Sequence, residues 1–468
     1  MKKLPKYLSL LPLMAIIMTG CNQSKPASES SSQSDSRPTS LVVSYDDSIP
    51  EECEEQHTLQ DNEVFFQLAA SNNPNRGVYN IYVPFSDNYF TSDSKVYNQD
   101  LSMLSYAASC LTESRNDLKR FFDRLGFDNQ YASSSYLIAP TQDTIGYYFA
   151  HKTIGNDEVI AVVARGFGYG KEWANNFQMG EDGNHYGFNA RVSDVLEDLD
   201  YYISNNYNDS SIKIWTTGYS RGGAISNMLA AQIIAERKYD VDESKMYAYT
   251  FEAPRGLTKQ NAVAYKSVFN IVNHGDVVPK VAPEQFDLYR CGIDIDIYQE
   301  NIGELLHRYD HGLKLPSFKT SAGKYDTPDL YADYVINSVT RELDDEEASM
   351  HTREDFFQNY EATIQYTMNM VFSLSGSTMS KLTDALTSNI MKILLTEDAL
   401  YETVKPILDE ANYPYDDHEL RFHCRQLHKL INGPANNIKY DLLGNNMSWM
   451  LCQHYPDINY VLLKNYAN

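Results

Sequence analysis

The sequence of 468 residues predicts an α/β fold, a mostly parallel sheet flanked by helices. Short apolar runs alternate with stretches of helical spacing between about residues 78 and 272. The run 159–164 contains no polar residue, which is typical of a strand buried on both faces of a parallel sheet. Polar, glycine-rich motifs follow several of these runs, at the strand ends where such sheets bind ligands.

The remaining elements follow from the spacing of apolar residues. Strands and helices alternate along the chain, which favours a doubly wound sheet. The predicted elements are a strand at 78–84, a helix at 98–125 ending at Gly126, strands at 159–164, 212–217, 246–251 and 267–272, and helices at 188–203 and 224–235.

The pattern changes after Tyr298. Stretches with helical spacing and acidic faces follow one another with little sign of strands: 329–345, 353–374, 378–395 and 417–432. We expect a helical insertion or cap over about residues 300–435, because sequence suited to a catalytic site resumes afterwards. The catalytic domain would then span residues 46–468.

The N-terminus has the form of a secretory signal. Three lysines among the first six residues precede an apolar run over residues 7–18, followed by Thr19, Gly20 and Cys21. The run is too short to span a bilayer. Its end resembles the lipobox of bacterial lipoproteins, although a methionine replaces the usual leucine. This resemblance implies cleavage before Cys21, lipid attachment to its sulfur and an extracytoplasmic, membrane-anchored location. The alternative is a secreted protein with an incidental cysteine.

Residues 22–45 are rich in serine and predict a flexible tether between that anchor and the folded domain. The formal charge of −24 argues against nucleic acid as a partner, because phosphate binding needs a basic surface. We expect no metal or other cofactor, since neither a calcium loop nor a Cys/His set of zinc spacing occurs. The five cysteines after Cys21 are too scattered for a dense disulfide framework.

The sharpest motif is G-Y-S-R-G-G over residues 218–223, between a predicted strand and a predicted helix. This is the context of a nucleophile elbow, with Ser220 as the nucleophile. Glycines at 218 and 222 are needed because side chains there would collide with neighbouring elements in so tight a turn. The following helix would direct backbone N–H groups and its positive end at a substrate oxygen.

A serine nucleophile needs a base, and the base needs an acid to orient it. With a nucleophile elbow the acid and the histidine follow the serine in that order. Asp276 fits the acid, since it lies in a polar segment after the strand at 267–272. The alternative is a turn aspartate that caps its own backbone.

Two positions remain open for the base. His454 precedes a final apolar stretch, where this fold usually places its base, and is favoured. His307 and His311 are the alternative, because they follow soon after the acid. His274 is too near Asp276 along the chain to be its natural partner. Four histidines on predicted helices with polar faces are expected at the surface: His351, His418, His423 and His428.

Stabilisation of a tetrahedral oxyanion requires two donors. We expect the backbone N–H of Arg221, directly after the nucleophile, and that of Phe167 in the glycine-rich loop 165–170. A phosphate cradle is the alternative for this loop, but it lacks both the Walker lysine-serine pair and G-x-G-x-x-G.

Taken together, these pieces resemble the class 3 lipase branch of the α/β hydrolases, specifically its bacterial relatives, over about residues 95–290. The matching motifs, in order, are VVARGF (162–167), EWANNF (172–177), HYGF (185–188), GYSRGGA (218–224), YTFEAPR (249–255) and NIVNHGDVVPK (270–280).

This resemblance implies an α/β-hydrolase fold and a Ser220-Asp276-His454 triad that hydrolyses carboxylic esters, lipids included, through an acyl-enzyme. The chain departs from the family at Tyr219, where histidine is commoner, and at Phe167, where Thr or Ser is frequent. The interval between acid and base is also long, which suggests a substantial lid. A thioesterase, peptidase or acyltransferase could use the same triad, and a non-catalytic surface-binding lipoprotein is the other alternative.

Overall fold

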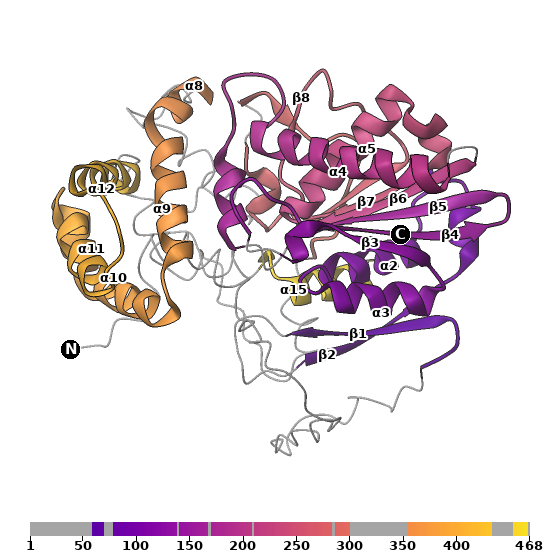
Figure 1. Ribbon diagram of the computed structural model, residues 1–468, viewed down its shortest axis with the longest axis horizontal. Coiled ribbons are helices and arrows are strands. Elements are labelled where there is room, and N and C mark those ends of the chain that lie inside the picture. The colour runs from indigo at the N-terminus through magenta and orange to yellow at the C-terminus, as the bar shows by residue number, and fades with distance from the viewer. Residues whose placement is uncertain are drawn as a thin grey trace, which may run out of the picture.

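The computed structural model describes residues 59–69, 78–137, 140–166, 170–207, 210–282, 286–299, 353–432 and 453–466. Within these residues the centre is a seven-stranded sheet of order β11-β9-β7-β6-β5-β4-β3 (Figure 1). The strands are β3 (Asp128–Ala132), β4 (Tyr147–Ile154), β5 (Asp157–Ala164), β6 (Ser211–Tyr219), β7 (Met246–Phe251), β9 (Val268–Val272) and β11 (Ile293–Asp296).

The five strands from β5 to β11 run parallel, and β4 and β3 continue the sheet in antiparallel order. Every residue of β7 and β9 is buried, as are the last six of β5. Strands covered on both faces need such uninterrupted runs, which is why the sequence revealed them. β3 and β4 were not predicted, although Gly155, with φ 66°, marks the tight turn that joins β4 to β5.

Helices cover both faces of the sheet (Figure 1). On one face, α4 (Tyr186–Asn206) and α5 (Arg221–Glu236) pack their apolar residues against the strands. On the other face lie α2 (Gln99–Cys110), α3 (Arg115–Leu125) and α15 (Pro456–Lys464). The hairpin β1 (Glu63–Ala69) and β2 (Val78–Pro84) packs against this second layer. The sheet therefore lies between two helical layers, each with its own apolar core.

The prediction of a single helix over 98–125 is wrong, because the chain forms two helices there, α2 and α3. Ser114 caps α3, its hydroxyl accepting a hydrogen bond from the Asp117 N–H at 3.3 Å. A serine side chain bonds a nearby backbone N–H more readily at a helix start than inside a helix, so it favours a break. Gly126, with φ 75°, ends α3 as expected.

Residues 353–432 form a helical unit beside the sheet domain (Figure 1). Its helices are α8 (Arg353–Phe356), the π-helical turn η8 (Phe357–Glu361), α9 (Ala362–Ser373), α10 (Gly376–Leu395), α11 (Ala399–Glu410) and α12 (Asp417–Asn432). The helices predicted over 353–374, 378–395 and 417–432 agree with this, whereas 329–345 lies outside the described residues. α11 was not predicted. Pro406 weakens its helical signal, but Leu400, Val404 and Leu408 pack into the core of the unit.

The helical unit is attached to the sheet domain through an apolar contact. Ile364 and Met368 of α9 join a buried cluster with Trp173 and Met179, which lie in and just after the 3₁₀ helix η3 (Gly170–Phe177). Because η3 follows the glycine-rich loop that starts at Arg165, the unit packs directly on the segment behind that loop.

The remaining elements are short. They are the small sheet of β8 (Leu257–Thr258) and β10 (Leu288–Tyr289) and the 3₁₀ helices η1 (Asp87–Phe90), η2 (Ser134–Tyr136), η4 (Lys238–Asp240), η5 (Glu243–Lys245) and η6 (Val278–Lys280). Among the described segments, none of the helices is long and apolar enough to cross a membrane. The expected signal peptide, Cys21 and the tether lie outside them.

Candidate active site

Ser220 sits on a sharp turn between β6 and α5, with φ 54° and ψ −125°. A side-chain-bearing residue is strained in this region, and such strain concentrates at functional sites. The turn has no room for other side chains beside it. A Cβ at Gly218 would lie 2.3 Å from the Gly222 carbonyl, and one at Gly222 would lie 2.3 Å from the Ala164 oxygen. The Ser220 N–H donates to the Phe251 carbonyl at 2.7 Å, which ties the turn to the end of β7.

The structure brings Ser220, His454 and Asp276 into one hydrogen-bonded chain. Ser220 Oγ lies 2.9 Å from His454 Nε2, and His454 Nδ1 lies 2.5 Å from Asp276 Oδ2. All three side chains are buried. Since an ionised carboxylate only accepts hydrogen bonds, Nδ1 carries the ring proton and Nε2 is left to accept from the serine hydroxyl. This arrangement can draw a proton from Ser220.

Asp276 is oriented by its own backbone as well as by the histidine. Its Oδ1 accepts the Val278 N–H at 2.9 Å, so Oδ2 is turned towards the ring. Asp276 therefore does both things that the sequence analysis considered: it caps its own turn through Oδ1 and contacts the histidine through Oδ2. Asn273 connects the two loops, since its side-chain amide donates to the Gln453 backbone carbonyl at 3.2 Å.

Two buried polar residues that the sequence analysis did not single out for a role hold His454 in place. The Tyr219 hydroxyl donates to the His454 carbonyl at 3.0 Å. Asn459, on α15, donates to the Tyr219 hydroxyl at 2.7 Å and to the Gln453 carbonyl at 2.8 Å. Tyr219, noted only as a departure from the family pattern, thus fixes the backbone that carries the base.

A buried ion-pair network lies behind the turn. Glu172, with no exposed surface, accepts from Arg165 at 2.7 Å and from Arg221 at 3.2 Å. Thr144 completes it, its hydroxyl donating to Glu172 at 2.7 Å and its carbonyl accepting from Arg221 at 3.0 Å. Removing one partner of such a pair costs about 3–5 kcal/mol. The network holds the first residue of α5, whose backbone N–H was the expected oxyanion donor, while Phe167 lies outside the described residues.

The other histidines contribute no contact to Ser220 in the described part of the chain. His274 pairs with Asp296 at 2.5 Å and lies against the Tyr298 ring. His418 is exposed and His428 partly buried. The expectation of a surface position is wrong for His423, which is buried and bonded to Thr363, because α12 turns that face inward against α9. The remaining candidates, His307, His311 and His351, lie outside the described residues.

The described cysteines are not nucleophile candidates. Cys110, Cys291 and Cys424 are free thiols, and burial raises the pKa of each to about 12. A thiol with so high a pKa stays protonated and unreactive near neutral pH. Ser220 is therefore the nucleophile that the surroundings favour.

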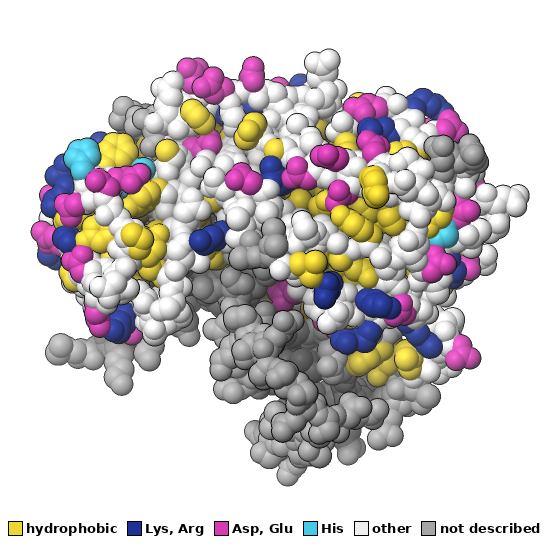
Figure 2. Space-filling view, viewed as in Figure 1, with side chains coloured by type: hydrophobic (Ala, Val, Ile, Leu, Met, Phe, Trp, Pro, Cys, Tyr) yellow, Lys and Arg dark blue, Asp and Glu magenta, His cyan; other side chains and the backbone are white. Residues whose placement is uncertain are grey.

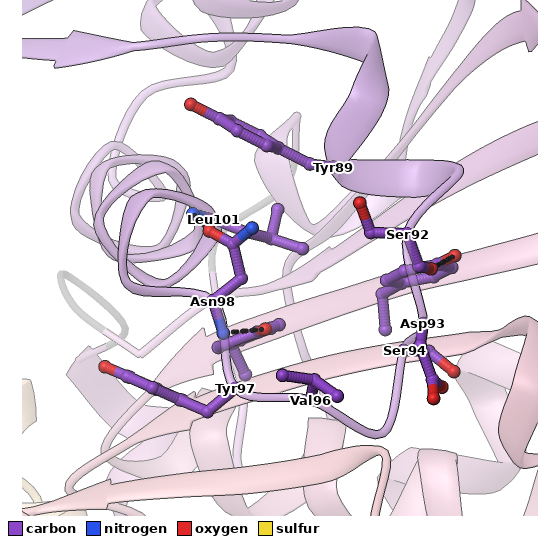
Figure 3. Close-up of a pocket in the computed structure, with 10 residues that line it drawn as sticks. Tyr89, Ser92, Asp93, Ser94, Val96, Tyr97, Asn98 and Leu101 are labelled. Atoms are coloured by element: carbon purple, nitrogen blue, oxygen red, sulfur yellow. Dashed lines mark hydrogen bonds between the residues drawn. The ribbon is translucent and has the colours of Figure 1, made fainter. Parts of the chain in front are cut away.

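A cavity of about 320 Å³ has none of Ser220, His454 and Asp276 among its lining residues. Figure 3 shows the residues that line it. Tyr97, Asn98, Tyr247 and Tyr249 are among its lining residues, and the Asn98 N–H donates to the Tyr249 hydroxyl at 3.2 Å. It lies along β7 towards the amino end of that strand, whereas Ser220 follows the carboxyl end of β6. It is therefore not the space in which Ser220 would meet a substrate.

A sequence model of the family described as lipase (class 3) matches residues 162–286, the part that contains Ser220 and Asp276. This match and the central sheet support an α/β-hydrolase fold and a serine ester hydrolase. The comparison with curated proteins gives no match.

Among solved structures, the chain is similar to a triacylglycerol lipase whose catalytic centre is described as a serine protease triad, at 18% identity over 44% of this chain and 83% of that one, with a TM-score of 0.36. A Rhizomucor miehei lipase–propeptide complex is similar at 18% identity over 44% and 69%, with a TM-score of 0.35. Lipase II from Rhizopus niveus gives 17% over 42% and 78%, with a TM-score of 0.33. Likeness this low carries no argument about the chemistry of this chain.

Proposed function

We propose that this protein is a cell-surface esterase or lipase that cleaves carboxylic esters with a Ser220-His454-Asp276 triad. The observation that carries the proposal is the hydrogen-bonded chain from Ser220 Oγ through His454 to Asp276 at a strained strand-to-helix turn. A lone serine hydroxyl is a poor nucleophile, and this contact supplies the base and the group that orients it.

In the proposed reaction, Ser220 Oγ forms a bond to the ester carbonyl carbon while its proton moves to His454 Nε2. The tetrahedral oxygen receives hydrogen bonds from the backbone N–H groups of Arg221 and Phe167, each worth roughly 3 kcal/mol in the transition state. The carbon–oxygen bond of the ester then breaks, and the imidazolium returns its proton to the departing alcohol. Water repeats both steps on the acyl-enzyme and releases the acid. Asp276 stabilises the imidazolium throughout.

The first test is labelling with a fluorophosphonate, which reacts covalently with activated serines. We expect the wild-type protein to take the label and Ser220→Ala to take none, with ester turnover reduced by about 10⁴-fold or more. His454→Ala should behave in the same way. Matched controls are Ser193→Ala and His418→Ala, both at exposed positions, which should label like the wild type.

Several results would count against parts of the proposal. A wild-type protein that takes no label would leave the non-catalytic lipoprotein as the better interpretation. Activity retained in His454→Ala but lost in His307→Ala or His311→Ala would move the base to that pair. Faster turnover of thioesters or amides than of esters on a matched panel would favour the thioesterase or peptidase alternative, and faster transfer to an added alcohol than to water would favour an acyltransferase.

We also propose that the enzyme is held on the outer side of a membrane by a lipid on Cys21. The basic start, the short apolar run and the small residues before Cys21 support this. A diacylglycerol anchor contributes about 0.8 kcal/mol per buried methylene, so two or more acyl chains give stable attachment.

A further inference from the structure

Glu252 is a second buried carboxyl group at the site, and the triad chemistry does not use it. It directly follows β7 and has no exposed surface. Its φ of 48° lies in the left-handed region, where a residue with a side chain is strained. The carbonyl just before it, that of Phe251, accepts the Ser220 N–H. The strained residue therefore adjoins the nucleophile turn.

The Glu252 side chain reaches the loop that carries the triad acid. Its two carboxyl oxygens accept the Asn273 N–H at 3.0 and 3.2 Å. The carboxyl group of Asp276 lies beside it, within hydrogen-bonding reach. Two carboxylates cannot form a hydrogen bond with each other unless one of them keeps a proton, because an ionised carboxylate has only acceptors.

The contacts indicate which carboxyl group keeps that proton. Asp276 receives the Val278 N–H and faces His454 Nδ1–H, and both donors stabilise its anion. Glu252 has one backbone donor and is fully buried. The proton therefore resides on Glu252, which donates to Asp276.

The charged and titratable groups around Glu252 favour the same assignment. Burial first, then the charge of Asp276, raises the pKa of Glu252 well above its usual range. Arg290 and the Asn273 N–H oppose this rise but do not reverse it. Tyr219 faces it from β6 and stays neutral, since burial and the charge of Asp276 raise its own pKa.

We infer that Glu252 is a positioning residue, a neutral carboxylic acid that donates a hydrogen bond to Asp276 and holds that carboxylate against His454. The inference rests on the proposed triad. Loss of the Glu252 proton would put two negative charges side by side behind the imidazole. That change would push Asp276 away from Glu252 and loosen its hold on the His454 ring, so the base would be less well placed.

The sign of the pH effect follows from the raised pKa. The folded state binds the Glu252 proton more tightly than the unfolded state does. The resulting stabilisation is fully present below the unfolded pKa, near 4.5, and is lost as the pH rises through the higher folded value. A variant that cannot ionise at this position keeps its folding stability as the pH rises.

Two substitutions separate the roles of this side chain. Glu252→Gln keeps a donor for Asp276 and an acceptor for the Asn273 N–H, but it cannot ionise. Glu252→Gly removes both contacts and relieves the strain of the positive φ. We expect Glu252→Gln to label at nearly the wild-type rate at neutral pH and to stay active at alkaline pH where the wild type declines. Glu252→Gly should fall about ten- to a hundredfold in labelling rate and kcat with little change in KM, because Asp276 loses its support.

Thermal unfolding gives a readout that is independent of activity. The Tm of Glu252→Gln should exceed that of the wild type by a margin that grows as the pH rises from 5 to 9. The exposed control Glu197→Gln should show no such trend. A margin that does not change with pH, or a Glu252→Gly enzyme that labels and turns over like the wild type, would overturn the inference.

These outcomes are separable from a failure of the proposed function. If the wild type takes no fluorophosphonate label, the esterase proposal and the positioning role fall together, whatever the Tm margins show. If the wild type labels normally and both Glu252 variants match it at every pH, the esterase proposal stands and only the positioning role is lost.

Discussion

Tyr219 shows how a single side chain next to Ser220 can act on His454, the proposed base. The tyrosine has no exposed surface, and its hydroxyl joins the His454 carbonyl to Asn459. The backbone that carries His454 is thereby tied to β6, the strand that carries Ser220. A histidine ring at this position would be shorter than tyrosine and would end in a nitrogen instead of a hydroxyl.

We predict that Tyr219→Phe lowers stability by about 1–3 kcal/mol, because the His454 carbonyl and the Asn459 amide lose a buried partner. The fluorophosphonate labelling rate should fall several-fold, since the imidazole is held less firmly. Tyr201→Phe is the matched control, because Tyr201 is 73% exposed. Equal unfolding midpoints in denaturant for the two variants would contradict the prediction.

Individual residues also show what could be predicted from the sequence and what could not. The glycines around Ser220 predicted the turn. A Cβ at Gly218 or Gly222 would lie 2.3 Å from a facing backbone atom, so no larger residue fits there. Glu172 and Glu252 lay within quoted motifs but were assigned no role. Their importance comes from burial and from partners such as Arg221 and Asp276, which lie tens of residues away in the chain and meet only after folding.

At the scale of elements, the π-helical turn η8 is the irregular part of the contact between the helical unit and the sheet domain. Its last residue, Glu361, is buried and accepts a hydrogen bond from Gln365 at 2.8 Å. The Met179 backbone, just after η3, lies close enough to favour its ionised form. Burial raises the pKa of Glu361 to about 7. Extra turns of this kind are frequent at functional positions.

Glu361 should make this contact depend on pH. Because its folded pKa is raised, its stabilisation is present below about pH 4.5 and is lost as the pH rises through about 7. We predict that Glu361→Gln has nearly the wild-type Tm at pH 4.5 and a Tm about 1–3 °C higher at pH 8. Glu402→Gln on the exposed face of α11 is the control, and an equal Tm difference at both pH values would refute the prediction.

The elements predicted from sequence were those with strong periodicity or continuous burial, such as β5, β7 and α4. The misses have local causes. Ser114 ended a helix inside a stretch whose apolar spacing continued past it, and Pro406 masked a helix whose apolar face packs well. Periodicity records which face is buried, but it does not record a break that a side-chain hydrogen bond creates.

At the scale of the whole molecule, the sheet domain carries Ser220, Asp276 and His454, and the helical unit packs on η3, just behind the loop expected to form the oxyanion site. Acidic and basic side chains are interspersed over the face shown in Figure 2, so the charge of −24 is not gathered into one patch there. On this face the interspersed charges favour solubility.

The proposed anchor is tested on the full chain in a bacterial host. Cys21→Ser should lose incorporation of a labelled fatty acid and move from the membrane fraction to the soluble fraction, since one thioether carries the diacylglycerol. Fluorophosphonate labelling of the released protein should be unchanged, because the catalytic domain is separate from the tether. Cys110→Ser is the control and should stay with the membrane. A wild type that incorporates no fatty acid would contradict the anchor.

The amino-acid sequence by itself determined the alternation of strands and helices, the turn that carries Ser220 and the chain order of the proposed serine, acid and base. These depend on local patterns: burial run by run, glycines that a turn requires, and polar segments at strand ends. Only the tertiary structure decided that His454 meets Ser220 at 2.9 Å, that Arg165 and Arg221 share Glu172, and that Glu252 contacts Asp276. Most of these contacts join residues tens to hundreds of positions apart, and their chemistry arises from burial in a low dielectric that no single segment creates.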